Sequence, residues 1–406
     1  MRAFGTCSAV VAACVLSLVT GGCAAPAATS TARAPSAPSA PAGTAAPGGA
    51  GYHAHGTLEA VAATSAANAW AVGDLGQQGT PLIVHWNGTK WSRVRAGAPA
   101  GTELRAVAAS SPGNAWALGQ TYPPVGVRPR SVILHWTGRA WRQVPSPAQS
   151  GAYLNSVSVT SSANAWIVGL YFASANRSAG STRPIALHWN GSAWRRVPLP
   201  LPAGAAAELT GVSATSASNA WAVGGFASSG PNRAAGFVLH WDGSSWSRVP
   251  SAPASAGQPI AVAATATDYA WLADSATGSE FAWPGGRVAG LWNGRDWTAV
   301  PIPLVQTHSE GRGGEVKALA VAGHAAWMAG DYCTTPTSCG NGQLLPLLLR
   351  WTGGAWQPTP LPANDLTIFG LAVLSSTSAW AVGDDYGNPT SPNQTLILHW
   401  NGSRWS

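Results

Sequence analysis

Seven copies of one tryptophan-rich unit predict an all-β protein, a seven-bladed β-propeller of four-stranded antiparallel blades. The phrase Ala-Trp-Ala-Val-Gly, with near-copies, recurs at intervals of 46 to 56 residues. Each copy also contains four short apolar runs, which match the length of β-strands. Only 9% of the residues are charged, which does not suit long amphipathic helices with solvated faces.

The four predicted strands follow one another in the same order in each copy. In the first copy they are "LEAVAAT", "AWAVG", "LIVHW" and "WSRV". A few small polar residues separate the first two runs. Asn-Gly and similar steps join the last two, and such steps favour the positive φ angles of tight hairpins. Short connections of this kind indicate antiparallel neighbours within each blade.

Three tryptophans per copy account for 21 of the 22 tryptophans in the chain, and only Trp283 is left over. A blade is covered on both faces by its neighbours, so wide apolar side chains must fill the wedge between sheets. Burial of ~200 Å² per indole contributes roughly 5 kcal/mol before entropy is counted. The alternative is a lectin whose repeated aromatic rings stack on sugars. Because the tryptophans lie inside strand patterns, we predict core packing.

A histidine precedes the second tryptophan in five of the seven copies, whereas Leu291 and Arg350 replace it in copies five and six. A metal ligand or catalytic base would tolerate neither replacement. We therefore predict a repeated hydrogen bond or a filler between blades. The five histidines are His85, His135, His188, His240 and His399.

Residues 1–23 have the layout of a secretory signal of the lipoprotein type, with an apolar stretch and small residues before Cys23. We predict lipidation at Cys23, although Thr20 departs from the usual aliphatic residue of a lipobox. Two alternatives are a lipobox ending at Cys14 and ordinary signal cleavage near residues 24–28. The expected location is extracytoplasmic, either lipid-anchored to the cell membrane or secreted.

Residues 24–56 are rich in Ala, Pro and Ser and predict a disordered tether, followed by the propeller over residues 57–406. In an exported chain Cys333 and Cys339 meet oxidising conditions, so we expect a disulfide between them. Two free thiols are the alternative. The last copy stops short of the "RVP" seen elsewhere, and residues 46–56 are too rich in Gly and Ala to predict a replacement strand. The sequence thus leaves the closure of the ring open.

The run "sAWAVGd…HWnGs.W" resembles the repeat of the Ycf48-like and Asp-box (BNR) propellers, as in secreted actinobacterial repeat proteins. In those families "GWAVG" precedes a "DGG-x-TW" turn. Here the turn is one residue shorter, as in residues 242–246, and most copies have Asn or Thr in place of Asp. The resemblance covers residues 58–406 and implies the propeller fold. The arginine triad, tyrosine nucleophile and acidic partners of the sialidases, which share the Asp-box, find no matching positions.

Antiparallel order places the variable connections, from second to third and from fourth to first strand, at one rim of the ring. Loops on a rigid scaffold are where binding usually occurs, so we predict the functional face there. The sequence puts acidic residues on one side of this rim, at Asp74, Asp331, Asp384 and Asp385. Arginines occupy the loops of the other side, at Arg128, Arg130, Arg177, Arg183 and Arg233.

Two interpretations of the rim carboxylates stay open. They can bind Ca²⁺ or a polar ligand, or each aspartate can begin a turn by hydrogen bonding to its own backbone. Trp283, which interrupts the repeat before Pro-Gly-Gly, either stacks on a ligand or packs over the rim.

We expect a monomeric, non-catalytic binding module for a protein or glycan, without a cofactor. The rival hypothesis is a carbohydrate-active hydrolase or lyase that uses rim acids such as Asp331 and Asp384. Phosphate loops, CxxC pairs, HExxH and GxSxG are absent from the sequence. The positive charges are spread along the chain rather than gathered on one segment, which does not favour nucleic-acid binding.

Overall fold

The computed structural model describes residues 52–76, 79–121, 129–148, 151–174, 178–226, 236–249, 258–275, 288–303, 315–333, 344–386 and 393–406. These ranges are almost entirely β-strand, with a short 3-10 turn at Ala179–Ser181. No helix in the described ranges is long and apolar enough to cross a membrane. The strands form seven separate antiparallel sheets, which confirms the predicted seven-bladed β-propeller.

Each blade runs outward from the first to the fourth strand in chain order. The first strands are β1 (Thr57–Ser65), β5 (Thr102–Ser111), β9 (Tyr153–Ser161), β13 (Ala207–Ser216), β17 (Gln258–Ala266), β21 (Glu315–Ala322) and β25 (Leu366–Ser375). The second strands are β2 (Asn68–Leu75), β6 (Asn114–Thr121), β10 (Asn164–Phe172), β14 (Asn219–Phe226), β18 (Tyr269–Ser275), β22 (Ala325–Cys333) and β26 (Ser378–Asp385). The third strands are β3 (Thr80–Trp86), β7 (Arg130–Trp136), β11 (Thr182–Trp189), β15 (Gly236–Trp241), β19 (Val288–Trp292), β23 (Leu344–Trp351) and β27 (Gln394–Trp400). The fourth strands are β4 (Trp91–Val94), β8 (Trp141–Val144), β12 (Trp194–Arg196), β16 (Trp246–Val249), β20 (Trp297–Pro301) and β24 (Trp356–Pro358).

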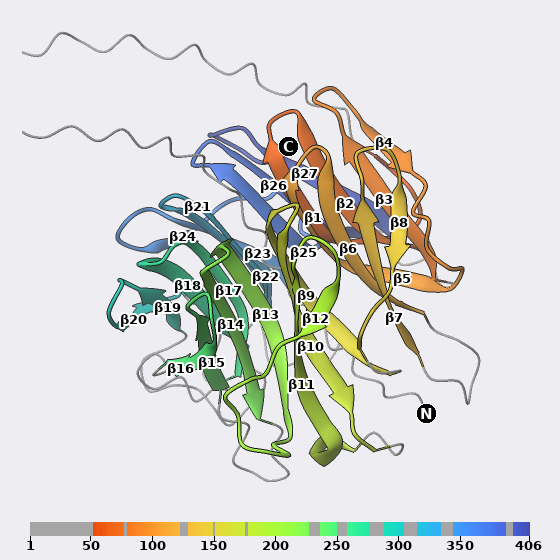
Figure 1. Cartoon of the computed structure of the whole chain (residues 1–406). Coiled ribbons are helices and arrows are strands. Elements are labelled where there is room, and N and C mark those ends of the chain that lie inside the picture. The colour runs from red at the N-terminus through yellow and green to blue at the C-terminus, as the bar shows by residue number, and fades with distance from the viewer. Residues whose placement is uncertain are drawn as a thin grey trace, which may run out of the picture.

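The seven first strands form the inner wall of a closed ring. Each of them contacts the first strand of the next blade, and β25 of the last blade contacts β1 of the first. Figure 1 shows this closure, with the blue strands β26 and β27 beside the orange strands of blade one. The innermost positions carry small side chains because the strands approach closely there. A Cβ added to Gly370 of β25 would lie 2.8 Å from the Cα of Ala60 in β1.

Tryptophans fill the wedges between blades, as predicted. The first indole of each blade contacts the second and third indoles of the next blade, with ring centroids 4.8 to 5.6 Å apart. The pattern passes through the closure, where Trp380 lies against Trp86 and Trp91. The first indole of each blade is buried. The first indoles therefore serve the core, and the second and third pack against them, which supports core packing rather than stacking on sugars.

The repeated histidine makes a repeated hydrogen bond, which confirms the structural interpretation. In blade one, His85 Nε2 lies 2.8 Å from Oδ1 of Asn68, and Thr64 accepts a hydrogen bond from the Asn68 amide. The same His–Asn pair occurs in blades two, three and four, and Ser378 replaces the asparagine in blade seven. Burial lowers the pKa of all five histidines, so the rings are neutral at pH 7.

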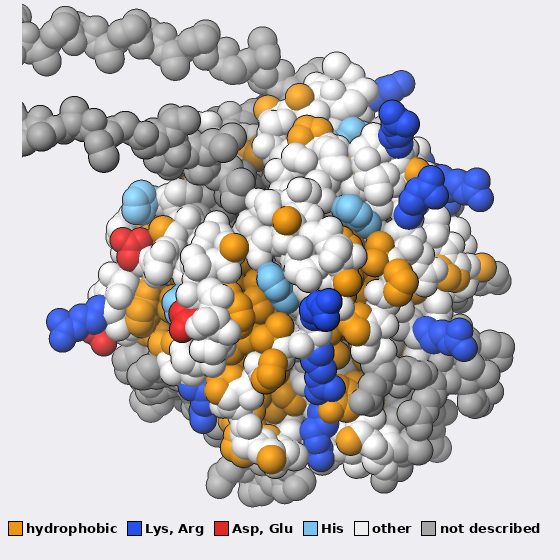
Figure 2. Space-filling model, viewed as in Figure 1, with side chains coloured by type: hydrophobic (Ala, Val, Ile, Leu, Met, Phe, Trp, Pro, Cys, Tyr) orange, Lys and Arg blue, Asp and Glu red, His pale blue; other side chains and the backbone are white. Residues whose placement is uncertain are grey.

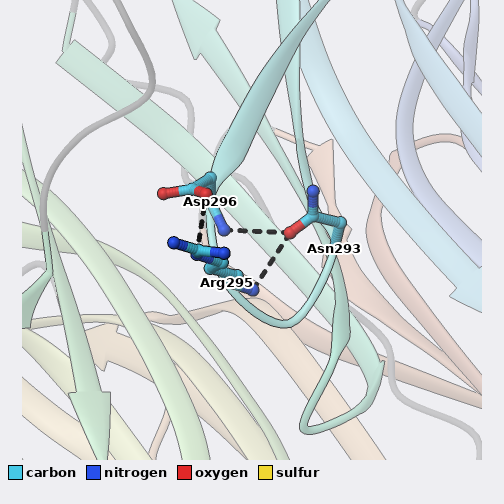
Figure 3. Close-up of polar contacts among 3 residues, drawn as sticks. All are labelled: Asn293, Arg295 and Asp296. Atoms are coloured by element: carbon cyan, nitrogen blue, oxygen red, sulfur yellow. Dashed lines mark hydrogen bonds and ion pairs between the residues drawn. The ribbon is translucent and has the colours of Figure 1, made fainter.

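The hairpins between third and fourth strands are tight turns closed by one side chain. In blade five, Oδ1 of Asn293 accepts hydrogen bonds from the backbone N–H groups of Arg295 and Asp296, at 3.0 and 2.9 Å (Figure 3). Gly294 between them has a φ of 94°, which only glycine adopts without strain. In blade four Asp242 takes the place of the asparagine, and hydrogen bonds from Ser245 and Ser244 lower its pKa to about 2. The one Asp-box-like aspartate is thus a turn residue.

Two short segments complete the outer edge of blade seven, whose sheet has three strands. Ser406 exchanges backbone hydrogen bonds with His399 of β27. Further along the same strand, the Thr395 N–H donates to the carbonyl of Ala54, and the Gly56 N–H donates to the carbonyl of Asn393. Residues 52–56, which the sequence groups with the tether, therefore pack on the propeller. Their composition does not predict this pairing, because backbone hydrogen bonds do not depend on side chains.

Candidate functional site

Second strands end and first strands begin at the same end of the ring, which we call the loop-bearing end. The last residues of the second strands lie opposite the start of the first strands. Three aspartates occupy equivalent places there, each directly after Ala-Trp-Ala-Val-Gly or a near-copy of it. Asp74 pairs with Thr57, Asp331 with Glu315 and Asp384 with Thr367. The sequence-based placement of these carboxylates at one rim is consistent with the fold.

Every first strand carries a β-bulge near this end. One residue is skipped in the pairing with the second strand of each blade, and we call these seven the bulge residues. The bulge also explains the glycine of the repeat, because a Cβ on Gly73 would overlap the carbonyl oxygen of Thr57. The bulge residues are Glu59, Arg105, Asn155, Thr210, Ile260, Lys317 and Phe369.

Several bulge residues reach across to the first strand of the next blade. Asn155 donates a hydrogen bond to the carbonyl of Leu209 at 2.8 Å. Thr210 Oγ1 lies 2.8 Å from the carbonyl of Pro259, and the Lys317 ammonium lies 4.8 Å from the centre of the Phe369 ring. The bulge residues thus share one backbone geometry around the inner wall, yet no two of them are the same amino acid.

Three carboxyl groups from blades seven and one lie close enough for the charges of Asp74 and Asp384 to act on Glu59. We call Glu59, Asp74 and Asp384 the carboxyl cluster. Asp384 is 5% exposed, and its Oδ2 accepts hydrogen bonds from Thr57 at 3.2 Å and from Asn393 at 2.6 Å. Its Oδ1 atom is buried without a hydrogen-bond partner among the described residues. Glu59 and Asp74 are partly exposed.

Burial opposes the ionisation of all three groups, and at Glu59 the neighbouring carboxyl charges add to this effect. Burial raises the pKa of Glu59 to about 7, Arg105 opposes the shift, and the charges of Asp74 and Asp384 add to it. Burial also raises the pKa of Asp74 to about 6, with a further contribution from Glu103. The pKa of Asp384 is raised by burial, against the opposing hydrogen bonds from Asn393, Thr57 and Thr367 and the charge of Lys317. Perturbed pKa values of this kind mark candidate functional sites.

The two cations nearest to the carboxyl cluster already have carboxylate partners. Arg105 pairs with Glu103 at 3.1 Å, and Lys317 pairs with Asp331 at 2.8 Å. Asp331, which the sequence grouped with the other rim aspartates, is therefore neutralised within its own blade. Asp385 is exposed at the end of β26.

The arginines predicted for the opposite side of the rim are described only in part. Arg130 is exposed at the start of β7, and Arg183 donates to the carbonyls of Gly180 and Thr182, at 3.0 and 2.7 Å. Exposed Lys and Arg side chains outnumber Asp and Glu in the view of Figure 2. Outside the described residues lie Arg128, Arg177, Arg233, Trp283, Cys23 and Cys339. The structure describes Cys333 only as the last residue of β22, so the predicted disulfide stays a prediction.

Glu59, Arg105 and Lys317 were not among the predicted site residues, because the first strands were expected to form the core. The available signal was a charged residue inside an apolar strand, at a position where the copies differ: "LEAV", "LRAV" and "VKAL". No group of three or more His, Cys, Asp or Glu side chains among the described residues is arranged to hold a metal ion. The Ca²⁺ alternative stays a prediction.

Comparison with known proteins supports the fold and leaves the activity open. No family model matches the chain, and no curated protein matches it. The solved structure of Ycf48 bound to a D1 peptide has a TM-score of 0.50 and 14% identity, and the match covers 85% of this chain and 92% of that one. A streptogramin B lyase has a TM-score of 0.51 and 12% identity, with 84% and 93% covered. The β-propeller domain of the Trilobed protease from Pyrococcus furiosus has a TM-score of 0.51 and 9% identity, with 86% and 96% covered. The chain is a seven-bladed β-propeller with Ycf48 among its structural neighbours.

Proposed function

We propose that this propeller is an extracytoplasmic, surface-tethered binding module without catalytic activity, which recognises a protein or glycan at its loop-bearing end. The observation that carries the proposal is the set of bulge residues, which combine one repeated geometry with seven different side chains. A repeat needs the same residue wherever neighbouring blades must pack. The bulge position is not fixed by that demand, because its residue changes from blade to blade even where it contacts a neighbouring strand. Its side chains therefore give each blade a different surface for recognition.

The rigidity of the inner wall supports this proposal. The bulge residues sit on strands paired within the blade and packed against the next blade, so their side chains are held in place before a ligand arrives. Such preorganisation lowers the entropic cost of binding. Of the two ligand classes, a protein segment has a precedent in the structural neighbour, since Ycf48 is seen with a peptide bound.

The tether and the location depend on the first 23 residues. We propose acylation at Cys23, which leaves residues 24–51 as a link between the membrane and the described part of the chain. The test is Cys23→Ser, with Cys14→Ser as the matched control. We expect only the Cys23 variant to lose membrane association and to change its electrophoretic mobility.

The binding proposal is tested by probing peptide and glycan arrays with the full chain, alongside a hydrolysis and elimination screen on the same compounds. We expect saturable binding without turnover. Binding should weaken when Glu59 is changed to Gln and persist in Glu208→Gln, because Glu208 lies on a first strand on the far side of the ring. Turnover that Glu59→Gln abolishes would replace the binding proposal with an enzymatic one.

The second candidate is a carbohydrate-active hydrolase or lyase that uses carboxyl groups of the loop-bearing end. The observation in its favour is the raised pKa of Glu59 and of Asp74, about 7 and about 6, which suits a proton donor and acceptor near neutral pH. Asp331, which the sequence suggested for this role, is a poor general acid or base because it is held in an ion pair with Lys317. An enzymatic activity would therefore depend on Glu59 and Asp74.

A further inference from the structure

We propose that the outer edge of blades one to four binds a flexible polymer that carries phosphate groups. This surface is distinct from the loop-bearing end of the proposed function, because it lies on the outermost strand of each blade. It is formed by five exposed arginines of four consecutive fourth strands, which we call the arginine belt. The members of the belt are Arg93 of β4, Arg142 of β8, Arg195 and Arg196 of β12, and Arg248 of β16.

The arginine belt is not neutralised by the fold. The six described fourth strands contain no Asp or Glu residue. None of the five arginines forms an ion pair with a described carboxylate. The adjoining hairpins of these blades add two exposed cations, Lys90 and Arg139, and one carboxylate, Asp242. Asp242 accepts hydrogen bonds from the backbone of its own turn. The outer edge of blades one to four is therefore a basic surface, which attracts anions.

The same asymmetry is visible on the surface of the molecule. In Figure 2 most of the blue side chains of Lys and Arg lie on the right and in the middle, where Figure 1 labels β4, β8 and β12. The red side chains of Asp and Glu lie on the left, on the side of β20. Positive charges that are spread along the sequence are thus gathered by the fold on one part of the ring's edge.

The propeller fold does not require these charges. In blade five the two residues after the tryptophan that begins the fourth strand are Thr298 and Ala299, and in blade six they are Gln357 and Pro358. Both strands pair with the third strand of their blade, as the arginine-bearing strands do. Uncharged residues therefore suffice at these positions, and a ligand accounts for the arginines.

Two arginines of the belt lie over aromatic rings of their own blade. The Arg196 guanidinium carbon lies 4.8 Å from the centre of the Tyr171 ring, and its Nη2 donates a hydrogen bond to the Tyr171 hydroxyl at 3.1 Å. The Arg248 guanidinium carbon lies 5.7 Å from the centre of the Phe226 ring. A guanidinium carries five N–H donors in a planar fork, so an arginine held on a ring keeps donors for a ligand. Phosphate oxygens match this fork with two parallel hydrogen bonds.

The position of the belt favours a flexible chain over a membrane surface. The blades follow one another around a closed ring, and their fourth strands are outermost. Four of the seven blades carry the belt, so it curves around more than half of the ring's edge. A flat lipid bilayer can contact only part of such a surface. A flexible polymer can follow the edge and contact arginines of several blades, and linked contacts bind far more tightly than single ones.

A nucleic acid fits this surface less well than a polymer of phosphate groups alone. Single-stranded nucleic acids gain much of their affinity from bases that stack on exposed aromatic side chains. The tryptophans of the described fourth strands are all buried, with 2 to 7% exposure. A duplex resists bending around so small a ring. The belt therefore selects phosphate groups and offers nothing to the bases.

The experiment measures binding of long-chain inorganic polyphosphate to the full chain at several NaCl concentrations. Inorganic monophosphate, phosphatidylglycerol vesicles and oligothymidylate with the same number of phosphates are the comparison ligands. Two double variants remove charges from different blades: Arg93→Gln with Arg142→Gln, and Arg195→Gln with Arg196→Gln. Arg295→Gln is the matched control, because the side chain of this arginine is 92% exposed in the hairpin of blade five, outside the belt. Thermal unfolding of every variant verifies the fold.

We expect polyphosphate to bind saturably, and at least about 100-fold more tightly per phosphate than monophosphate does. The affinity should fall with salt, with a slope of about −3.5 in a plot of log K against log salt concentration, as about five phosphate contacts imply. Each double variant should weaken binding by about tenfold and make the slope shallower by about 1.4, and Arg295→Gln should do neither.

Three results would overturn this assignment. Wild-type affinity in both double variants would show that the belt makes no contact with the polymer. Tighter binding per phosphate to the vesicles than to polyphosphate would identify a membrane contact instead, and tighter binding to oligothymidylate would identify a nucleic-acid surface. None of these results bears on the loop-bearing end, where Glu59→Gln tests the proposed function.

Discussion

The ammonium of Lys317 lies 2.8 Å from Oδ2 of Asp331, and the two side chains are 11% and 6% exposed. The pair joins the bulge of the first strand in blade six to the end of its second strand. This ion pair distinguishes Asp331 from Asp74 and Asp384, which occupy equivalent positions in their blades. Neither of those two aspartates forms an ion pair with a described side chain. One blade thus pairs its rim aspartate with a cation, whereas Asp384 is hydrogen bonded by Thr57 and Asn393 and Asp74 is partly exposed.

For the Lys317–Asp331 pair we predict that removing one charge destabilises the fold more than removing both. Lys317→Met leaves a buried carboxylate without its partner and should cost about 3–5 kcal/mol of unfolding free energy. Lys317→Met combined with Asp331→Leu removes both charges and should cost much less. Urea unfolding of the two variants measures the difference. Equal losses would show that the cost of Lys317→Met does not come from an unpaired Asp331 carboxylate.

Because the pKa of Glu59 is raised, we predict that the stability of the fold declines with rising pH. Its folded-state pKa of about 7 lies above the ordinary 4.5, so the folded protein retains a proton that the unfolded chain has already lost. The free energy of unfolding is therefore highest, as far as Glu59 is concerned, below about pH 4.5. It decreases as the pH rises from about 4.5 through about 7, and the total decrease is up to about 3 kcal/mol. Glu59→Gln should flatten the decline between pH 5 and 8, measured by urea unfolding across that range. A Glu208→Gln control should keep the decline, and a Glu59→Gln profile with the wild-type slope would contradict the assignment.

Gly73 is predicted to resist substitution because of the bulge that faces it. A Cβ there would overlap the backbone carbonyl of Thr57, which cannot rotate away as a flexible side chain can. We expect Gly73→Ala to destabilise by about 1–3 kcal/mol, the range for overpacked sites. Gly354→Ala is the matched control, since a Cβ at that position would meet no described atom within 4 Å. Thermal and urea unfolding of the two variants give the comparison, and equal stability would argue against the bulge.

Ring closure is predicted to be as strong as the other blade contacts. Trp380 contacts Trp86 and Trp91 with the geometry that Trp116 has with Trp189 and Trp194. Trp380→Ala and Trp116→Ala should therefore each cost about 3–5 kcal/mol in unfolding free energy. Urea unfolding of the two variants side by side measures both losses. A much smaller loss for Trp380→Ala would show that the last blade closes the ring only loosely.

The repeating parts of the structure could be predicted from the sequence. The tryptophan spacing predicted seven blades, and the Asn-Gly steps predicted hairpins that the turn at Asn293 and Gly294 confirms. The change of His to Leu291 or Arg350 in two copies correctly indicated a structural role. In each case the reason is the same: a packing demand that recurs around the ring leaves a recurring residue.

The carboxyl cluster could be predicted only in part. Asp74 and Asp384 stand out in the sequence because each follows the repeated glycine. Glu59 does not, because it lies within an apolar strand and only the bulge removes it from the strand's pairing. Bulges depend on how two strands meet, and the local mark of this one is a single charged residue inside the apolar run "LEAVAAT".

The sequence by itself determined the fold class, the number of blades and the indole wedges, because hydrophobic burial between repeated sheets acts through local residue patterns. Only the tertiary structure decided which charges meet. Ring closure brings Asp384 of β26 to Thr57 of β1, 327 positions away, and the bulge of β21 pairs Lys317 with Asp331 within one blade. Electrostatic interactions depend on distance in space, and that distance exists only once the ring is closed.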